Sequence, residues 1–533
     1  MTEMVLLGDE ALAMGAIHAG ISAAYAYPGT PSTEITEFLI EYSKREGSPK
    51  ASWCVNEKTA FEEALGVSLV GKRSLVSMKH VGLNVAADPF INAALLEING
   101  GLVLAVADDP GMHSSQNEQD SRFYADFAKI LCLEPRNQQE TYEMAVEAFE
   151  LSEQFHIPIM IRLSTRLAHS RAVVTVGDKK PENELCKAQD TSAWMLLPAF
   201  ARTRWEVLLD KQADLARYCE ASPHNRLEIN PGFAEFGVIT AGIGRNYYEE
   251  NVSELAAKPS HLHIATYPIP VNKVRELAQR VKKIVVIEEG YPFIEKALNG
   301  ILPPAVKVAG KESGDIPLTG ELNPDSVRPI LALEPKQGLN AVEFTLPPRP
   351  PQLCAGCPHA DSYDALKIAL SGYPQSLVTS DIGCYALGAL PPYSAIETIV
   401  CMGASIGLAK GASEAGFSPV VAVIGDSTFL HSGLTPTLDA VAANTPVTIL
   451  ILDNGTVAMT GGQETIIPSS RIEPLIIGLG VEKEHIRIIN PLKKYTEENA
   501  AIIKQEIEYE GVSVILSTRE CIETLKIKKK HRG

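Results

Sequence analysis

The sequence lacks the features that would place it in a membrane or on nucleic acid. No apolar run approaches the ~20 residues of a membrane-spanning helix, and the opening stretch MTEMVLLGDEALAMG has no basic region of the kind that begins a signal peptide. Positive charge is in deficit, with 48 Lys and Arg against 65 Asp and Glu and a formal net charge of −17. An acidic chain argues against a large nucleic-acid or membrane-binding surface. We therefore expect a cytoplasmic protein that binds neither.

Two other signals are missing as well. Nine cysteines in 533 residues are too few for the disulfide framework of a small secreted domain, and they indicate metal-binding, catalytic or buried thiols instead. No GxGxxG segment is present, so nothing predicts a Rossmann dinucleotide site. With 45% hydrophobic and 21% charged residues, the composition describes a globular protein with an ample core. The length suits three or four domains of ~150 residues each.

The most informative stretch begins at Gly425. Apolar runs at 420–424 and 447–452 predict two strands, and the segment between them has a helical composition. Two parallel strands follow from this order, and they would place Asp426 and Asn454 just past the carboxyl ends, where open α/β sheets bind ligands. A carboxylate and an amide oxygen suit Mg²⁺, and a glycine with a following helix suits an anion. The alternative is an ordinary crossover with polar strand ends.

Residues 1–175 alternate predicted strands and helices, with strands at 23–27, 51–55, 75–78, 102–107 and 157–163 and a helix at 141–155. Three side chains near strand ends are candidates for an active site. Thr30 is expected to cap the next helix, either as a plain cap or with its hydroxyl directed at a ligand. Glu57 falls in a first helical turn, where an acid also suits the helix dipole. Lys79 ends a strand, and the polar loop 108–120 follows the next one.

The middle of the chain carries no reactive constellation. Residues 176–234 are interpreted as an irregular, packed connector, and residues 235–345 as a small α/β domain with a structural and subunit-contact role. Four prolines at positions 347, 348, 350 and 351 then indicate an extended linker before the last domain.

That last domain opens with the pair Cys354 and Cys357, a spacing typical of metal or redox hairpins. Cys384 is a third candidate and Cys521 a fourth, with Cys401 as a competitor. A zinc site needs four ligands and a [4Fe–4S] cluster needs four thiolates. The spacing alone leaves a cluster, a structural zinc and unligated thiols open.

Taken together, these motifs resemble a known family. GDS followed twenty-six residues later by Asn resembles the diphosphate-binding motif of thiamine diphosphate enzymes. Further segments resemble the large subunit of indolepyruvate:ferredoxin oxidoreductases, within the 2-oxoacid:ferredoxin oxidoreductases. They are YPGTPSTE, NEKTAFEEA, DDPGMHSSQNEQD, LCAGCPH, SDIGCYALG, CMGASIGLAKG and LDNGTVAMTGGQ. The similarity covers essentially the whole chain.

The resemblance implies a fold class, which is a multidomain α/β protein of the thiamine diphosphate-binding type. It has two doubly wound parallel-sheet domains and one transketolase C-terminal-like domain. The pyrimidine-binding domain would be 1–175 and the connector 176–234. The transketolase C-terminal-like domain would be 235–345 and the diphosphate-binding domain 346–533.

The resemblance also implies roles for particular residues. Glu57 would hydrogen-bond the aminopyrimidine of the cofactor, and Thr30, Lys79 and the 113–118 loop would orient the substrate. The remaining positions concern cofactor and metal. Mg²⁺ would be held by Asp426, Asn454 and the Thr456 carbonyl; the cofactor would be lined by Gly425, Ser427, Gly403 and Cys384; and a [4Fe–4S] cluster would be held by Cys354, Cys357, Cys384 and Cys521.

The implied reaction is oxidative decarboxylation of an aryl 2-oxoacid with CoA as acceptor and ferredoxin as electron acceptor. A smaller beta subunit would complete a heterotetramer. Such large subunits usually continue into a ferredoxin-like module, which is missing here. The module would be a separate subunit, or the sequence was cut, or the chemistry is no longer ferredoxin-linked. The alternatives are a non-oxidative decarboxylase or carboligase and a non-catalytic assembly subunit.

Overall fold

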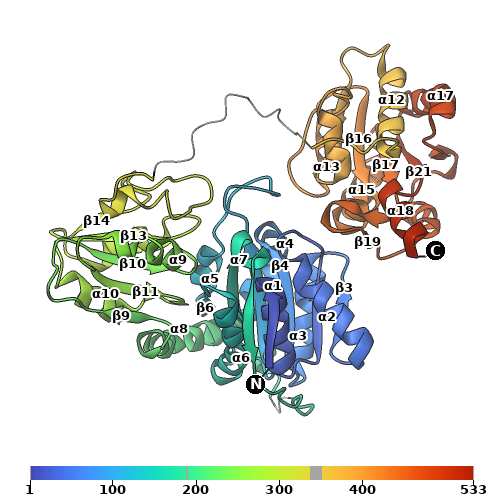
Figure 1. Cartoon of the computed structure of the whole chain (residues 1–533). Coiled ribbons are helices and arrows are strands. Elements are labelled where there is room, and N and C mark those ends of the chain that lie inside the picture. Colours follow the sequence, from blue (N-terminus) through green and yellow to red (C-terminus); the bar gives the residue numbers. More distant parts are fainter. Residues whose placement is uncertain (1, 188–189, 337–350, 532–533) are drawn as a thin grey trace. The chain divides into compact units, whose positions relative to one another are not determined.

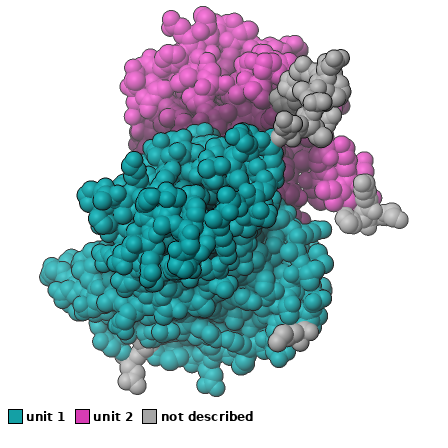
Figure 2. Space-filling view, turned by 60° about the vertical axis from the view of Figure 1, so that its left-hand side comes forward, with its two compact units in different colours: residues 1–341 teal, residues 342–533 magenta. Residues whose placement is uncertain are grey.

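The computed structural model describes residues 2–187, 190–336 and 351–531 (Figure 1). The chain divides into two compact units, residues 1–341 and residues 342–533, which Figure 2 distinguishes by colour. Both units are built from mainly parallel sheets with helices between the strands, so the predicted α/β class is confirmed. Within the described ranges, no helix has the length and apolar character to span a membrane. The predicted proline linker lies mostly in 337–350, outside the described residues.

The first unit contains a seven-stranded sheet in the order β12-β6-β7-β5-β4-β2-β3. Its strands are β2 (Ala23–Ala26), β3 (Lys50–Trp53), β4 (Ser74–Lys79), β5 (Leu102–Asp108), β6 (Cys132–Leu133), β7 (Ile159–Ser164) and β12 (Thr266–Tyr267). All neighbouring pairs are parallel except β6 with β12. Every residue of β4, β5 and β7 is buried, as expected of strands covered on both faces. The strands predicted near 23, 51, 75, 102 and 157 are confirmed.

Helices cover both faces of this sheet. They are α1 (Gly8–His18), α2 (Thr33–Glu46), α3 (Glu57–Leu69), α4 (His80–Ala93), α5 (Arg122–Ala128), α6 (Gln138–Phe155) and α7 (Thr165–His169). Helices α1, α2 and α6 belong to one layer, and α3 packs with α4 in the other. A separate antiparallel pair, β1 (Thr2–Leu7) with β8 (Arg171–Val176), lies before α1 and after α7.

The rest of the first unit forms a five-stranded sheet in the order β14-β13-β10-β11-β9. The strands are β9 (Arg226–Glu228), β10 (Gly237–Ala241), β11 (Ser260–Ile264), β13 (Lys283–Ile287) and β14 (Lys307–Ala309), and the helices are α9 (Gly244–Glu249), α10 (Val271–Ala278) and α11 (Phe293–Ile301).

The connector was expected to be irregular, and this was wrong. A 24-residue helix, α8 (Pro198–Ala221), occupies much of it, beginning with a proline in the first turn. Only Leu208, Leu215 and Cys219 are buried along its length. Such a narrow apolar stripe leaves little helical periodicity in the sequence, which explains the missed helix.

The second unit contains an all-parallel sheet in the order β15-β16-β17-β21-β20 and a short antiparallel pair, β18 (Thr456–Val457) with β19 (Gln463–Glu464). Its strands are β15 (Leu377–Thr379), β16 (Val420–Gly425), β17 (Val447–Asp453), β20 (Ile486–Ile489) and β21 (Val512–Thr518). Its helices are α12 (Pro358–Leu370), α13 (Ala404–Glu414), α14 (Asp426–Thr428), α15 (Leu434–Ala442), α16 (Ile472–Gly478), α17 (Thr496–Ile507) and α18 (Ile522–His531). The two predicted strands, now β16 and β17, are adjacent and parallel, with Ile424 paired to Ile451.

Candidate active site

In the second unit, polar side chains gather where β16 and β17 end. Asp426 directly follows β16 and is only 4% exposed. Its carboxylate accepts backbone hydrogen bonds from Ser427 (2.8 Å) and from Gly455 (2.7 Å), which lies beyond β17. Asn454 directly follows β17, and its side-chain oxygen accepts the N–H of Thr456 at 3.0 Å. Parallel pairing of the two strands therefore brings the predicted oxygen donors to one place.

A second carboxyl group, that of Asp453, lies at the same strand end. Burial, and then the neighbouring Asp453, raise the pKa of the Asp426 carboxyl to about 8. Asp453 is itself 3% exposed and accepts the Ser469 hydroxyl at 2.7 Å. A divalent cation among these oxygen donors would offset the repulsion between the two acids, so the donor set fits Mg²⁺. Sequence reasoning missed Asp453, although it stands beside Asn454 at the same strand end.

His359 is a further residue that the sequence analysis did not single out. It lies in the first turn of α12, and its Nε2 is 3.1 Å from the Asn454 amide nitrogen. Burial lowers the pKa of His359 to about 4, so the neutral ring accepts this hydrogen bond. The contact fixes which side of the Asn454 amide presents its oxygen. In the sequence, only the CxxC pair just before His359 indicates that this histidine lies near a functional site.

Two glycines allow close packing around this edge. Gly403, at a φ of 80°, precedes α13, and a Cβ there would lie 2.4 Å from the Ser432 Cβ. A Cβ on Gly425 would lie 2.5 Å from the ring of Tyr385. The bare Cα of Gly425 makes room for that ring, and the expected approach of a ligand to its backbone stays a prediction. The start of α13 is held by Asp381, which accepts the Ser405 hydroxyl at 2.6 Å.

Four cysteines from distant parts of the sequence meet in the same unit. Cys354 and Cys357 form a turn before α12, Cys384 begins a short 3-10 helix, and Cys521 follows β21. Burial and then the other three thiols raise the pKa of Cys384 to about 12. The N–H of Cys521 donates to the Asn454 carbonyl at 3.1 Å. Cys521 is thereby joined to the strand end that carries Asn454, and the Asp426 carboxyl also acts on the Cys384 thiol.

The two kinds of metal centre considered for these thiols would need different sulfur spacings. A tetrahedral zinc with Zn–S bonds of ~2.3 Å needs sulfurs only ~3.8 Å apart. No three of the four thiols, all within the described residues, lie within 4.8 Å of one another. A cubane cluster holds each thiolate on a separate iron and so needs a wider arrangement. The competitor Cys401 is exposed.

In the first unit, Glu57 and Lys79 lie at the carboxyl edge of the seven-stranded sheet. Asn56 caps α3 by accepting the Thr59 N–H at 2.8 Å, which leaves Glu57 as the first helical residue, 5% exposed. Lys79 ends β4, and its ammonium group donates to the Ser114 carbonyl at 2.9 Å. Burial lowers the pKa of Lys79 to about 8, against the opposing charges of Asp109 and Glu57.

The predicted cap at Thr30 was wrong. Helix α2 begins at Thr33 with Ser32 as its N-cap residue. The preceding turn is closed on Gly29, whose carbonyl accepts the Ser32 hydroxyl (2.7 Å) and whose N–H donates to the Thr33 hydroxyl (3.0 Å). Thr30 lies in this turn, and its carbonyl accepts the Ser114 hydroxyl at 3.1 Å. The turn and the 113–118 loop are thereby joined.

Asp109 organises that loop and was not singled out from the sequence. Its carboxylate accepts the Ser114 N–H (2.8 Å), the Ser115 hydroxyl (2.7 Å) and the Thr165 hydroxyl (2.8 Å). His80, one residue after Lys79, has its Nε2 3.1 Å from the Asn117 carbonyl. The first unit therefore brings together Glu57, Lys79 and the turn that carries Thr30.

Two family models match parts of this chain. Residues 14–235 match the family model described as "Pyruvate flavodoxin/ferredoxin oxidoreductase, thiamine diP-bdg". Residues 381–515 match "Thiamine pyrophosphate enzyme, C-terminal TPP binding domain". With the two parallel-sheet units, these matches define a multidomain α/β protein of the thiamine diphosphate-binding class.

Individual relatives narrow the class. The chain is 38% identical to the indolepyruvate oxidoreductase subunit IorA of Methanothermobacter thermautotrophicus, over 98% of this chain and 87% of that one. The IorA subunit of Archaeoglobus fulgidus is 36% identical over 97% and 86%, and that of Pyrococcus abyssi is 34% identical over 97% and 85%. The chain belongs to the 2-oxoacid:ferredoxin oxidoreductase family.

Proposed function

We propose that the chain is the large subunit of an enzyme that oxidatively decarboxylates an aryl 2-oxoacid of the indolepyruvate kind. The acyl group would pass to CoA and the electrons to ferredoxin. The observation that carries the proposal is the backbone hydrogen bond from Cys521 to Asn454. It joins the four-thiol cluster to the strand end that holds the oxygen donors, as an enzyme coupling decarboxylation to electron transfer requires.

Three oxygen donors would hold the diphosphate end of thiamine diphosphate through Mg²⁺. They are the Asp426 carboxylate, the Asn454 side-chain oxygen and the Thr456 carbonyl. Ser427, Gly403, Gly425 and Cys384 would line the bound cofactor. When bound, the cofactor supplies an electron sink for the loss of CO₂.

In the first unit, the proposed roles concern the aminopyrimidine ring of thiamine diphosphate and the substrate. The Glu57 carboxyl would hydrogen-bond the aminopyrimidine ring, a role that suits its 5% exposure. Lys79 would attract the substrate carboxylate, and Thr30 would help to orient it from the turn after β2. A buried lysine with a lowered pKa has a weakly solvated charge that can pair strongly with an anion.

The four thiols of Cys354, Cys357, Cys384 and Cys521 would bind one [4Fe–4S] cluster. We assign residues 1–175 to the pyrimidine side, 346–533 to the diphosphate side, and 235–345 to a transketolase C-terminal-like domain joined by the connector 176–234. A smaller beta subunit would complete the enzyme as a heterotetramer and contribute to CoA binding. Ferredoxin, or a separate ferredoxin-like subunit, would take the electrons in the cytoplasm.

Viologen reduction by the chain purified with its small subunit tests this proposal. Reduction should require thiamine diphosphate, Mg²⁺, CoA and a 2-oxoacid, and indolepyruvate should give a higher kcat/KM than pyruvate or 2-oxoglutarate. Aldehyde release without any acceptor would instead favour a non-oxidative decarboxylase or carboligase. Failure to bind thiamine diphosphate would indicate an assembly subunit.

Asp426→Asn provides the matched variant for that assay. The substitution keeps the side-chain size and removes the charge from the cation site. We expect cofactor binding to weaken by at least ~100-fold, since even residues behind metal ligands are worth 10- to 100-fold. Glu414→Gln, on an exposed part of α13, removes the same charge and should leave binding unchanged.

A further inference from the structure

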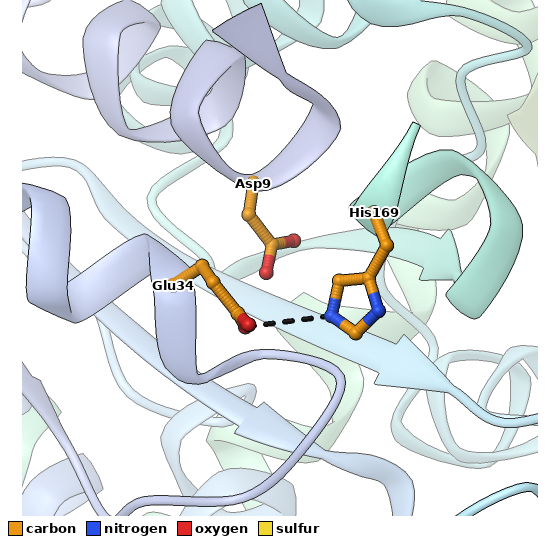
Figure 3. Close-up of side chains that lie close together, drawn as sticks. All are labelled: Asp9, Glu34 and His169. Atoms are coloured by element: carbon orange, nitrogen blue, oxygen red, sulfur yellow. Dashed lines mark ion pairs between the residues drawn. The ribbon is translucent and has the colours of Figure 1, made fainter. Parts of the chain in front are cut away.

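Three side chains able to bind a metal converge in the first unit, and none of them has been given a role above. Asp9 lies in the first turn of α1, Glu34 in the first turn of α2 and His169 at the end of α7 (Figure 3). One ligand atom from each lies within 4.8 Å of the other two. Figure 3 shows all three side chains directed toward a common point.

Asp9 is the unusual member of this cluster. It is fully buried, and neither of its carboxylate oxygens has a hydrogen-bond partner. Helix capping does not explain it, because the neighbouring Glu10 accepts the Leu7 N–H at 2.8 Å instead. A buried carboxylate without a partner is strongly unfavourable. The second acid, Glu34, adds to the cost by its charge.

The three residues are held in place by tight packing. Gly8 opens α1 directly against α7, and a Cβ on it would lie 2.2 Å from the Leu167 carbonyl oxygen. This contact sets Asp9 beside the end of α7, where His169 lies. Glu34 is placed by the closed turn that begins at Gly29. The convergence therefore follows from backbone contacts, with no ion needed to assemble it.

We propose that Asp9, Glu34 and His169 bind one divalent transition-metal ion, such as Zn²⁺, Mn²⁺ or Co²⁺. The Glu34 Oε2 to His169 Nε2 distance is 3.4 Å. That value equals the edge of a tetrahedron whose ligands lie ~2.1 Å from zinc. Two carboxylates with one imidazole favour a transition metal over Mg²⁺. The side chains of Glu34 and His169, each 35% exposed, leave a route for the ion and for a water ligand.

The ion would brace the turn that carries Thr30. Glu34 stands four residues after Thr30 in the first turn of α2. Helix α7 begins at Thr165, whose hydroxyl bonds Asp109, the organiser of the 113–118 loop. Joining α1, α2 and α7 at one point would restrain both segments. This inference does not depend on the proposed reaction, because the site is defined by its own three ligands.

Titration of the full chain with Co²⁺, after removal of bound metal by EDTA, tests the site. Co²⁺ bound by oxygen and nitrogen gives weak visible bands, whereas thiolate ligands add strong charge-transfer bands in the near ultraviolet. The Asp9 site should therefore appear as one equivalent without thiolate bands. In Asp9→Asn that equivalent should be lost or bind at least tenfold more weakly. Glu10→Gln, with the same charge change one residue away, should retain it.

Melting temperatures measured with and without Zn²⁺ provide a second test, which is needed if Co²⁺ also binds at other places on the chain. Zn²⁺ should raise the melting temperature of the wild type and of Glu10→Gln more than that of Asp9→Asn. Without metal, Asp9→Asn should melt at or above the wild type, because the buried charge is gone. Equal Co²⁺ stoichiometry with equal affinity in the wild type and Asp9→Asn would overturn the proposal and indicate that Asp9 is simply protonated.

Discussion

The carboxyl group of Glu57 lies against the bare Cα of Gly82, at the start of the next helix along the chain. A Cβ on Gly82 would be only 2.6 Å from Glu57 Oε1 and 2.7 Å from its Cγ. Because Gly82 has no side chain, the Glu57 carboxyl can lie directly against α4. We expect Gly82→Ala to displace the Glu57 carboxyl while the helix itself is retained.

Because a displacement of about 1 Å can cost roughly 100-fold in rate, Gly82→Ala should lower kcat in the viologen assay by about that factor. Gly66→Ala is the matched control, since Gly66 lies on α3 with nothing within 4 Å of an added Cβ. It should leave kcat unchanged and stabilise the chain by roughly 0.5–1 kcal/mol through helix propensity. Equal activities of the two variants would contradict a role for the Glu57 position.

The strand framework could be predicted from sequence because buried parallel strands read as short apolar runs between turn residues. Thus β16 and β17, and with them the adjacency of Asp426 and Asn454, followed from two runs of valine, isoleucine and leucine. The Thr30 cap failed because the residue before a helix does not reveal how far a preceding turn extends. Asp453 and His359 were missed because their importance comes from neighbours that are close only in the folded chain.

The buried charges around Arg162 give a stability prediction for the first unit. Arg162 lies on β7 and pairs with Asp108 (2.6 Å) and with Glu134 (2.5 Å), and all three are almost completely buried. Arg162→Met would leave both carboxylates without this partner, which typically costs 3–5 kcal/mol. This loss of stability should appear as a lower urea midpoint for unfolding of the first unit. Arg217→Met, which breaks an exposed pair with Asp214, should change stability by less than ~0.5 kcal/mol.

Cys521 and Cys401 should respond differently to the same substitution. Cys521 is buried, and its charge helps to raise the pKa of the Cys384 thiol, whereas Cys401 is exposed. Cys521→Ser should reduce the iron and acid-labile sulfide of purified protein to less than half of the wild-type content. Cys401→Ser should leave both unchanged. Full iron content in Cys521→Ser would exclude Cys521 as the fourth ligand. A residue other than Cys521 would then complete the site with Cys354, Cys357 and Cys384.

Lys79 makes the stability of the chain depend on pH in a direction that can be worked out. Burial lowers the pKa of its ammonium group to about 8 from an ordinary 10.5, although Glu57, Asp109 and the Ser114 carbonyl all favour the charged form. As the pH rises, the folded chain therefore releases this proton before the unfolded chain does. Between about pH 8 and 10.5 the unfolded chain binds more protons, so the free energy of unfolding rises with pH. At ~1.4 kcal/mol per pKa unit, the contribution is about 3 kcal/mol.

The difference in urea midpoint between the wild type and Lys79→Met isolates this contribution, because all other titrating groups are shared. Methionine keeps most of the side-chain volume of Lys79. The variant loses the hydrogen bond to the Ser114 carbonyl, which lowers its stability by an amount that does not vary with pH. We expect the wild type to gain stability relative to Lys79→Met from about pH 8 upward, and the difference to be level below that. A difference that stays constant up to about pH 10 would mean that Lys79 keeps its ordinary pKa. Its ammonium group would then be well solvated, and a desolvated charge that pairs strongly with a substrate carboxylate could no longer be assigned to it.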